Sequence, residues 1–319
     1  MSKNYGYACI NMHLSYPKKY GNAPRGVDRI TTNRSMIKRT FMEKGTTYAS
    51  HLALQNVRDL CKILEWNKEN QIFFYRLSSD VLPWASEYNI EDLPDYNLIL
   101  AACYRAGNYA KANGMRLTAH PGPFNKLASP KERVFELTKK DLTVHGEFFD
   151  MLNLPRTPYA KLNIHVGAAY GDKPMTLDNF CRNFERLPEC VRSRLTVEND
   201  DKESLYSTQE LYRGVYERIG IPIVFDYHHH MLHPGDLTER EALELAISTW
   251  PDDIKPVVHY AESRSIEHGN PKIKPQAHSD MIVNPFNDYG YDLDVMIEAK
   301  HKELALLNYR DTLNEGMAN

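Results

Sequence analysis

The sequence predicts a single (β/α)8 barrel of the TIM type, an α/β fold that spans residues 1–319. Three observations predict this fold. Short runs rich in Val, Ile, Leu and aromatic residues alternate with longer amphipathic runs along the chain. Eight short runs are found, which is the number of strands in such a barrel. No GxGxxG loop follows an early run, and this disfavours the competing fold, an open doubly wound sheet.

The expected strands are nearly continuous in apolar residues, as buried parallel strands are. In chain order they are residues 5–12, 71–77, 115–120, 161–166, 194–199, 221–227, 255–260 and 292–299.

The stretches between the strands have helical periodicity and begin with residues that favour a helix N-cap. The clearest helices are expected over residues 48–70, 96–114, 129–152 and 238–247. The expected caps are Ser129 followed by Pro130, Thr176, Ser207 or Thr208, and Thr238.

Composition limits the function only weakly. The net charge of −3 does not indicate a nucleic-acid partner. Residues 18–44, however, carry eight basic side chains and only two acidic ones on a stretch rich in Gly, Pro, Thr and Asn. Such a stretch is either a solvated loop or a loop that contacts phosphates.

The five cysteines show no CxxC spacing, so we expect a reducing intracellular compartment, such as the cytoplasm and nucleoid, the nucleus or a mitochondrion. No apolar run approaches the length of a membrane span. The start, MSKNYGYACINM, lacks the apolar segment of a signal peptide.

Six consecutive strands end in a residue that can bind a metal ion. They end at His120, His165, Glu198, Asp226, His259 and Glu298, and His229 follows Asp226 by three positions. The carboxyl ends of barrel strands converge on one site, where several carboxylates are costly unless cations offset their charge. Mixed imidazole and carboxylate groups suit Zn²⁺, Mn²⁺ or Fe²⁺, and the number of groups predicts two or three ions.

Other histidines lie near these positions. His278, just before the last strand, is a further candidate ligand. In the run VFDYHHHMLHPG (224–235) we expect structural or surface positions for His228, His230 and His233.

The chain resembles the UV damage endonuclease family, a relative of endonuclease IV among the xylose-isomerase-like barrels. Matching stretches run from residue 6 to beyond residue 300. The most specific are HPGP (120–123), HVGAAYGDK (165–173), ENDD (198–201) and MIEAKHKE (296–303).

The resemblance implies a metal-dependent repair endonuclease that recognises UV photoproducts in duplex DNA and cuts the backbone 5′ to the damage. Mn²⁺ is the implied ion, with Zn²⁺, Mg²⁺ or Co²⁺ as alternatives. The implied ligands are His120, His165, Glu198, Asp226, His229, His259, His278 and Glu298, with Glu87 where the family has a histidine. Glu198, Glu298 and His259 are the predicted catalytic residues.

The resemblance also implies residues that contact damaged DNA. The family's Gln-Tyr wedge, which opens the duplex at the lesion, corresponds here to Pro123 and Phe124. The other predicted DNA-binding residues are Tyr7, Asn11, Lys18, Lys19, Arg25, Asn33 and Arg34. Ordinary packing is an open alternative for Tyr7.

Departures from the family pattern keep other functions open. Val257 stands where the family has a lysine. Lys255 lies two residues earlier, on the same face of the strand. The alternatives are a metal-dependent sugar isomerase or epimerase, and a damage-binding protein without turnover. We expect a monomer with no obligatory protein partner.

Overall fold

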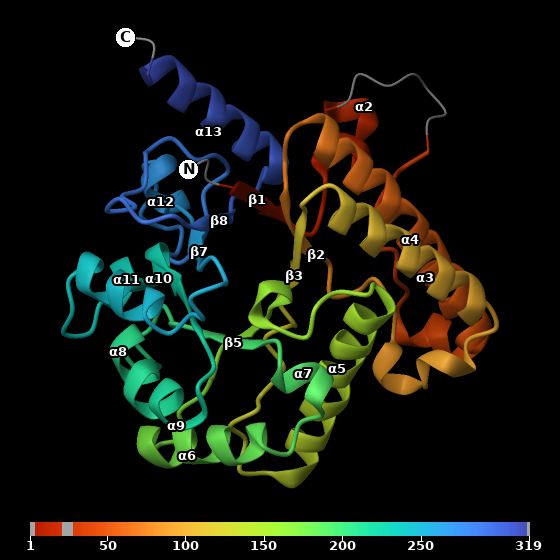
Figure 1. Cartoon of the computed structure of the whole chain (residues 1–319), viewed down its shortest axis with the longest axis horizontal. Helices are drawn as coiled ribbons and strands as arrows, with labels where there is room; N and C mark the ends of the chain where they lie inside the picture. Colours follow the sequence, from red (N-terminus) through yellow and green to blue (C-terminus); the bar gives the residue numbers. More distant parts are fainter. Residues whose placement is uncertain (1–3, 21–27, 318–319) are drawn as a thin grey trace.

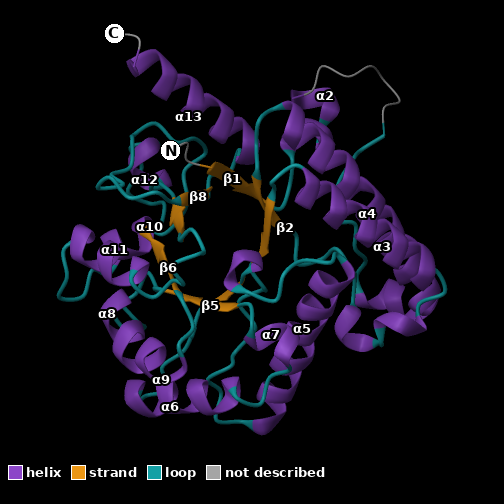
Figure 2. Ribbon diagram, viewed as in Figure 1, coloured by secondary structure: helices purple, strands orange, loops and turns teal. Residues whose placement is uncertain are grey.

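Eight parallel strands form a closed barrel in the computed structural model, which describes residues 4–20 and 28–317. The strands surround the centre of the molecule and the helices lie outside them (Figure 1, Figure 2). The strands are β1 Asn4–Ala8, β2 Phe74–Leu77, β3 Arg116–Ala119, β4 Leu162–Ile164, β5 Leu195–Glu198, β6 Ile223–Asp226, β7 Val257–Tyr260 and β8 Asp294–Ile297. The predicted fold class is confirmed, and every expected strand is present.

The barrel closes because β1 pairs with β8, from Asn4 opposite Asp294 to Tyr7 opposite Ile297. Gly6 in β1 is required by close packing. A Cβ atom at Gly6 would lie 2.6 Å from the carbonyl oxygen of Phe74 on the neighbouring strand. Only glycine therefore fits at this point of the wall.

The helices bury their apolar faces against the outside of the barrel. They are α1 Met12–Ser15, α2 Pro17–Tyr20, α3 Lys38–Glu69, α4 Tyr96–Ala112, α5 Glu132–Met151, α6 Lys173–Phe184, α7 Glu189–Arg192, α8 Thr208–Leu211, α9 Glu217–Ile219, α10 Tyr227–Leu232, α11 Glu239–Ile247, α12 Arg264–Glu267 and α13 Lys302–Met317. Short helical turns are η1 Ala85–Glu87, η2 Ile90–Asp92, η3 Pro158–Ala160 and η4 Tyr212–Tyr216. Helix α3 begins before the expected residue 48 and has a break at Gly45, where φ is 62°.

Two of the expected helix caps are confirmed. Ser207 and Thr238 each form a capping box with the glutamate three residues later. The cap at Thr176 is wrong, because Asp172 accepts the hydrogen bond from the Met175 amide and α6 begins earlier. Ser129 lies just before the N-cap of α5 and accepts from the Lys131 amide at 3.1 Å.

A buried ion pair fills the amino end of the barrel. Arg116 Nη1 lies 3.0 Å from Asp294 Oδ2, and both side chains are almost completely buried. Arg116 also donates to the carbonyls of Tyr159, Lys255 and Pro158. The Lys255 ammonium lies 2.6 Å from Asp292 and 3.5 Å from Asp294, so it belongs to this end of the barrel.

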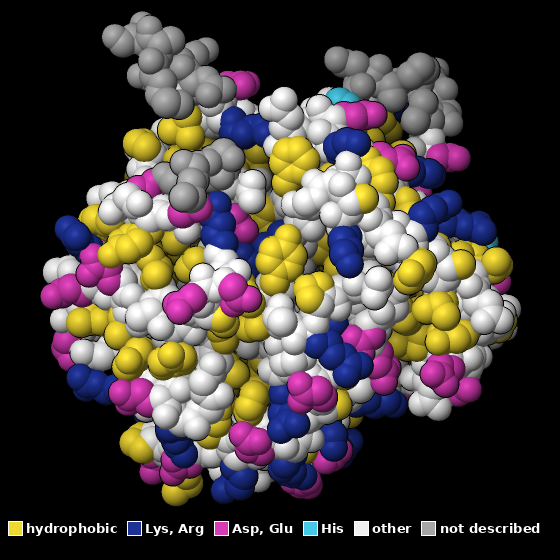
Figure 3. All heavy atoms as spheres, viewed as in Figure 1, with side chains coloured by type: hydrophobic (Ala, Val, Ile, Leu, Met, Phe, Trp, Pro, Cys, Tyr) yellow, Lys and Arg dark blue, Asp and Glu magenta, His cyan; other side chains and the backbone are white. Residues whose placement is uncertain are grey.

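All five cysteines are free thiols, and four of them are buried. Among residues 4–20 and 28–317, no helix combines the length and the apolar character needed to cross a membrane. Figure 3 shows one face of the molecule, where basic and acidic side chains are interspersed and histidine is scarcely visible.

Candidate metal centre

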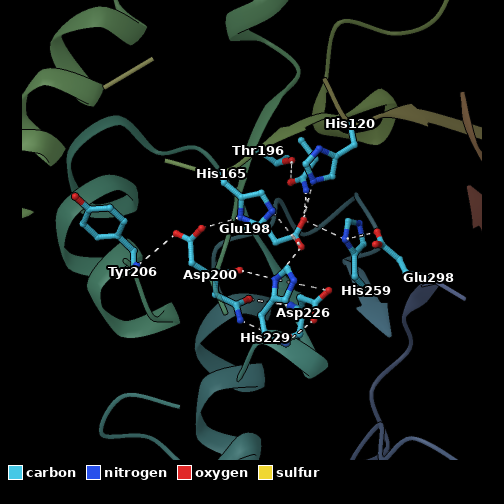
Figure 4. Close-up of polar contacts among 12 residues, drawn as sticks. His120, His165, Thr196, Glu198, Asp200, Tyr206, Asp226, His229, His259 and Glu298 are labelled. Atoms are coloured by element: carbon cyan, nitrogen blue, oxygen red, sulfur yellow. Dashed lines mark hydrogen bonds and ion pairs between the residues drawn. The ribbon is translucent and has the colours of Figure 1, made fainter. Parts of the chain in front are cut away.

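The predicted ligands other than Glu87 meet at the carboxyl end of the barrel, around the carboxylate of Glu198, and Figure 4 shows most of them. Four imidazoles surround this carboxylate, one from β7 and three from the segments that follow β3, β4 and β6. The distances to Glu198 are 3.0 Å from His259 Nδ1, 3.3 Å from His120 Nε2, 3.3 Å from His229 Nδ1 and 3.7 Å from His165 Nε2. Consecutive parallel strands bring these residues together although they are far apart in sequence.

Two further carboxylates border the same cluster. Glu298, directly after β8, lies 3.1 Å from His259 Nδ1 and 3.7 Å from His278 Nδ1, and it forms an ion pair with Arg76. Asp226, at the end of β6, accepts a hydrogen bond from the His229 amide at 2.8 Å. The cluster therefore joins three carboxylates to five histidines.

The cluster has a deep part and an accessible part. Asp226 and His259 are completely buried and the Glu198 side chain is 2% exposed. The side chains of His165 and His278 are 25% and 26% exposed. A ligand would therefore enter past His165 and His278 and meet Glu198 at the bottom.

The electrostatics of the cluster favour a charged Glu198 beside two kinds of imidazole. Burial favours neutral His259 and His120, whereas His229 and His165, although also buried, have pKa values raised by the neighbouring carboxylates. Burial alone would raise the pKa of Glu198, but the charges of His259 and His165 bring this pKa well below its usual value. Burial lowers the pKa of His259, and it lowers the pKa of His120 to about 4. Metal ions bind the charged carboxylate and the neutral imidazoles, because a ligand must offer a free lone pair.

Asp226 differs from Glu198. Burial raises the pKa of Asp226 to about 6, with the nearby charges of Glu198 and Glu298 adding to the effect and His229 opposing it. Its buried Oδ2 atom accepts no hydrogen bond. A buried carboxylate oxygen without a donor is costly, and a cation would offset that cost.

The residues present fit divalent metal ions. Two sets of ligand atoms, each within 4.8 Å of one another, share the Glu198 carboxylate: His120, His165 and Glu198, and Glu198, Asp226 and His259. A carboxylate common to two sets of ligands would suit neighbouring divalent ions, because its two oxygens can accept more than one partner.

Several side chains that the sequence did not indicate hold the ligands in place. Asp200 Oδ1 lies 3.2 Å from His165 Nδ1, and Asn163 Nδ2 donates to Glu198. Asn199 donates to the Asp226 carbonyl and accepts from the Asp226 amide. Carboxylate and amide partners of this kind fix the orientation of metal ligands. The sequence did contain a signal for Asn163. It lies two residues before His165, and residues two apart in a strand point to the same face.

A buried lysine lies below the cluster. Lys161 is completely buried, and its Nζ lies 3.2 Å from His259 Nε2. Burial lowers the pKa of Lys161 to about 7, while Glu198 opposes that shift. The nitrogen of His259 that faces away from the carboxylates therefore also has a polar partner.

Glu87 does not join this cluster. It lies exposed at the end of η1, and none of the metal-binding groups found among residues 4–20 and 28–317 includes it. The prediction that Glu87 is a ligand is thus unsupported by the geometry. The short turn after β2 carries the side chain toward solvent.

The neighbouring histidines of the 224–235 run are buried rather than on the surface. His228, His230 and His233 are 2%, 4% and 7% exposed. They lie on and just after α10, whose first turn presents His229 to the cluster. Burial excludes the surface alternative for these three histidines and is compatible with the other expectation, a structural position, because α10 packs this face inward.

Tyr7 and Asn11 do not reach a surface that DNA could contact. Both are completely buried. The Tyr7 hydroxyl donates to Asn67 at 2.7 Å and accepts from Asn11 at 2.9 Å, and Asn11 caps α1 by accepting from the Leu14 amide. The prediction that they bind the lesion is corrected, since a closed hydrogen-bond network uses their polar groups.

The predicted basic residues lie in the connection between β1 and α3. Lys18 and Lys19 are exposed on α2, whereas Arg25 falls within residues 21–27, outside the described residues. Arg34 forms an ion pair with Asp59 at 2.7 Å, and Asn33 accepts from the Thr31 hydroxyl. Arg34 and Asn33 thus stabilise this connection through contacts inside the protein.

Phe124 lies on the loop that follows the proposed ligand His120. It is 66% exposed on the loop between β3 and α5, next to the exposed Pro123. Its ring lies over Gly122, where a Cβ atom would be 2.4 Å from Phe124 Cε1. A cavity of about 210 Å³ is lined by this loop and by His120, His165 and His229.

The chain matches a family model described as UV-endonuclease UvdE over residues 3–318. It is 34% identical to a UV-damage endonuclease of Schizosaccharomyces pombe over 311 residues, which cover 94% of this chain and 49% of that protein. It is 32% identical to a UV DNA damage endonuclease of Bacillus cereus over 274 residues, which cover 83% of this chain and 82% of that protein. The chain spans about half the length of the fungal relatives that it matches.

Solved structures show the same likeness. The crystal structure of SacUVDE has a TM-score of 0.82 and 27% identity, and the match covers 98% of this chain and 99% of that chain. A D-tagatose 3-epimerase-like protein, with a TM-score of 0.53 and 16% identity over 80% of this chain and 91% of that chain, shares the fold alone.

Proposed function

Because the chain belongs to the UV-endonuclease UvdE family, we propose that it is a DNA repair endonuclease that cuts the backbone of UV-damaged duplex DNA, 5′ to the lesion, with divalent metal ions. The observation that carries the metal dependence is the Glu198 carboxylate, which four imidazoles surround at 3.0 to 3.7 Å. Mn²⁺ is the ion we propose, because mixed imidazole and carboxylate ligands suit it.

The proposed ligands are the clustered residues, without Glu87. They are His120, His165, Glu198, Asp226, His229, His259, His278 and Glu298. When bound there, divalent ions would supply the positive charge that activates water and stabilises a phosphodiester under attack.

The protein's own part is to orient these groups and to hold their protonation states. Asp200 faces His165 Nδ1, which leaves Nε2 directed toward Glu198. Arg76 balances the charge of Glu298. Burial keeps His259 neutral, so that it offers a lone pair at neutral pH.

The departure at Glu87 does not argue for an inactive damage-binding protein. Its side chain lies apart from the eight clustered residues, so the change from histidine leaves that cluster complete. The sugar isomerase or epimerase alternative rests on fold likeness alone.

A nicking assay tests the proposal. Supercoiled plasmid, with and without UV irradiation, is incubated with the protein in Mn²⁺ or in EDTA. We expect open circles only when both UV damage and Mn²⁺ are present. A labelled duplex with one pyrimidine dimer then gives the position of the cut, which we expect on the 5′ side.

The opposite outcome is equally informative. If no metal supports nicking although the purified protein contains bound ions, the endonuclease proposal is wrong and a sugar substrate becomes the hypothesis to test.

A further inference from the structure

We propose that Tyr170 is a second DNA-contacting aromatic residue, which stacks on an unpaired base beside the lesion while Phe124 contacts the duplex from the neighbouring loop. This inference rests on the proposed function. It adds to that function a residue on the connection after β4, five positions beyond the proposed ligand His165, that the strand-end pattern did not indicate.

Tyr170 and Phe124 occupy equivalent places on neighbouring connections. Phe124 follows β3 and its terminal His120, and Tyr170 follows β4 and His165. The two imidazole rings have centroids 5.4 Å apart. The two loops that carry the aromatic side chains therefore leave the barrel side by side, directly above the proposed ligands.

A hydrogen bond joins the two loops. Lys126 Nζ donates to the carbonyl of Gly167 at 2.8 Å. Gly167 has a φ of 71°, and a Cβ atom there would lie 2.9 Å from Lys126 Nζ. Glycine thus lets the ammonium approach the backbone closely, and the loops form one continuous rim.

Each loop is also fixed at its base. Asn125 donates to Asp141 at 2.8 Å and to the Gly122 carbonyl at 3.1 Å. In the other loop the Ala169 carbonyl accepts from the Thr176 hydroxyl at 2.6 Å and from the Asp172 amide at 2.9 Å. The backbone under both aromatic rings is therefore held in one conformation.

Packing does not explain a tyrosine at position 170. Its side chain is 49% exposed, and within the described part of the chain no hydrogen bond to its hydroxyl is found. Its φ of 46° is left-handed, a conformation that glycine or asparagine adopts more readily. A strained and exposed aromatic residue on a loop that follows a proposed metal ligand suggests contact with a substrate.

The chemistry of this rim matches damaged DNA. An aromatic ring stacks on any nucleobase, and a base next to a photoproduct is already poorly stacked. Lys126 and Lys202 line the same cavity and supply positive charge for the backbone, although Asp200 and Asp201 lie there too. Two rings on adjacent loops allow contact with bases on both sides of one lesion.

The test compares affinities for damaged and undamaged duplexes. A duplex with one pyrimidine dimer and a fluorescent 2-aminopurine beside it, and its undamaged twin, are titrated with protein in EDTA so that no cleavage occurs. Tyr170→Gly removes the ring and relieves the left-handed strain. We expect its preference for the damaged duplex to fall about tenfold, with a melting temperature no lower than that of the wild type.

Three variants serve as controls. Tyr170→Phe keeps the ring and should keep the preference. Tyr104→Ala removes a tyrosine of similar exposure, 54%, from the outer helix α4 and should change nothing. Tyr170→Asn, which also tolerates a positive φ, repeats the test if Tyr170→Gly does not fold.

The outcomes separate this inference from the proposed function. If wild-type protein shows no preference for the damaged duplex, the proposed function fails. If the wild type prefers damage and Tyr170→Gly retains that preference, the role of Tyr170 is refuted. An equal loss of affinity for both duplexes also refutes it, because Tyr170 would then be a general DNA contact.

Discussion

The two ends of the barrel both bury carboxylates, but they balance the negative charge in different ways. At the amino end, Asp294 lies 3.0 Å from Arg116, 3.5 Å from Lys255 and 3.1 Å from the Asn4 amide nitrogen. At the carboxyl end, Glu198 is surrounded by imidazoles and by the Asn163 amide, none of them a fixed cation, and Asp226 leaves a buried oxygen without a donor.

This difference separates structure from function within one barrel. Fixed cations satisfy the amino end, so nothing further is required to bind there. At the carboxyl end Arg76 pairs with Glu298, but the charge of the imidazoles around Glu198 and Asp226 depends on pH, so the negative charge there is not permanently balanced. That charge is what a divalent cation would offset.

Removing the central carboxylate should have the largest effect. Glu198→Ala should lower nicking more than about 100-fold, because Glu198 is common to both ligand sets. Glu298→Ala should behave in the same way. Plasmid nicking, metal content and circular dichroism measure this together, and Glu136→Ala on the exposed face of α5 is the control. Retained activity in both variants would refute the metal centre.

Breaking the ion pair at the amino end should affect stability instead. Arg116→Met leaves Asp294 buried without its main counterion, which should lower the free energy of unfolding by about 3–5 kcal/mol. Urea denaturation at pH 7 measures this change. Metal affinity of the folded protein should be unchanged, and Asp294→Asn in the same chain should restore much of the stability. A metal affinity that falls with Arg116→Met would mean that the two ends are coupled.

Loss of an orienting carboxylate should have an intermediate effect. Asp200→Asn should weaken metal binding about 10–100-fold, since it removes the charge that faces His165 Nδ1. Titration with Mn²⁺ measures the affinity. The exposed Asp252→Asn is the control. If Asp200→Asn leaves the affinity for Mn²⁺ unchanged, Asp200 stabilises its own loop and does not orient His165.

The pH dependence of metal binding should follow Asp226. Its pKa is raised to about 6, so below this pH a proton competes with the metal and affinity should fall about tenfold per pH unit. Above pH 6 the remaining dependence should come from His229, whose pKa the neighbouring carboxylates hold well above its usual value despite burial, because His120, with a pKa of about 4, is already neutral. Asp226→Asn should bind more weakly and lose the step at pH 6. A step that remains in this variant would belong to another group.

The raised pKa of Asp226 also affects the stability of the metal-free protein. Because the folded state holds the Asp226 proton more tightly than the unfolded state, this group's contribution to stability decreases as pH rises from about 4 to about 6.

The smallest expected effect concerns the charges on α2. Lys18→Glu with Lys19→Glu should reduce the salt dependence of DNA binding by about two units of slope, if each lysine contacts one phosphate. The matched pair Lys68→Glu and Lys111→Glu lies at the last turns of α3 and α4, toward the amino end of the barrel, and should leave the slope unchanged. If both pairs of substitutions give the same salt dependence of DNA binding, α2 is a solvated surface that does not contact DNA.

The sequence predicted the barrel well because its signal is repeated. Each strand is an apolar run that ends near a polar residue, and eight repeats specify the topology. Helix ends were harder to place. Asp172 outcompetes Thr176 as the cap of α6, and a glycine break lets α3 begin at Lys38.

The sequence predicted those residues of the candidate site that lie at the ends of strands. His120, Glu198 and His259 meet because strand ends converge, whereas Glu87 lies on a turn whose direction the sequence does not specify. Asp200 and Lys161 act through contacts between separate strands and connections, which no local spacing reveals.

The hydrogen bond from Lys126 to Gly167 also matters for protein engineering. It makes residues 121–128 and 166–172 a single cassette that chimeras should exchange together. Pairing the Lys126 loop with a loop that lacks Gly167 would place a Cβ atom 2.9 Å from the ammonium and would disturb the contact between the two loops. Lesion range, if it depends on this rim, should therefore be transferable between relatives only as a two-loop unit.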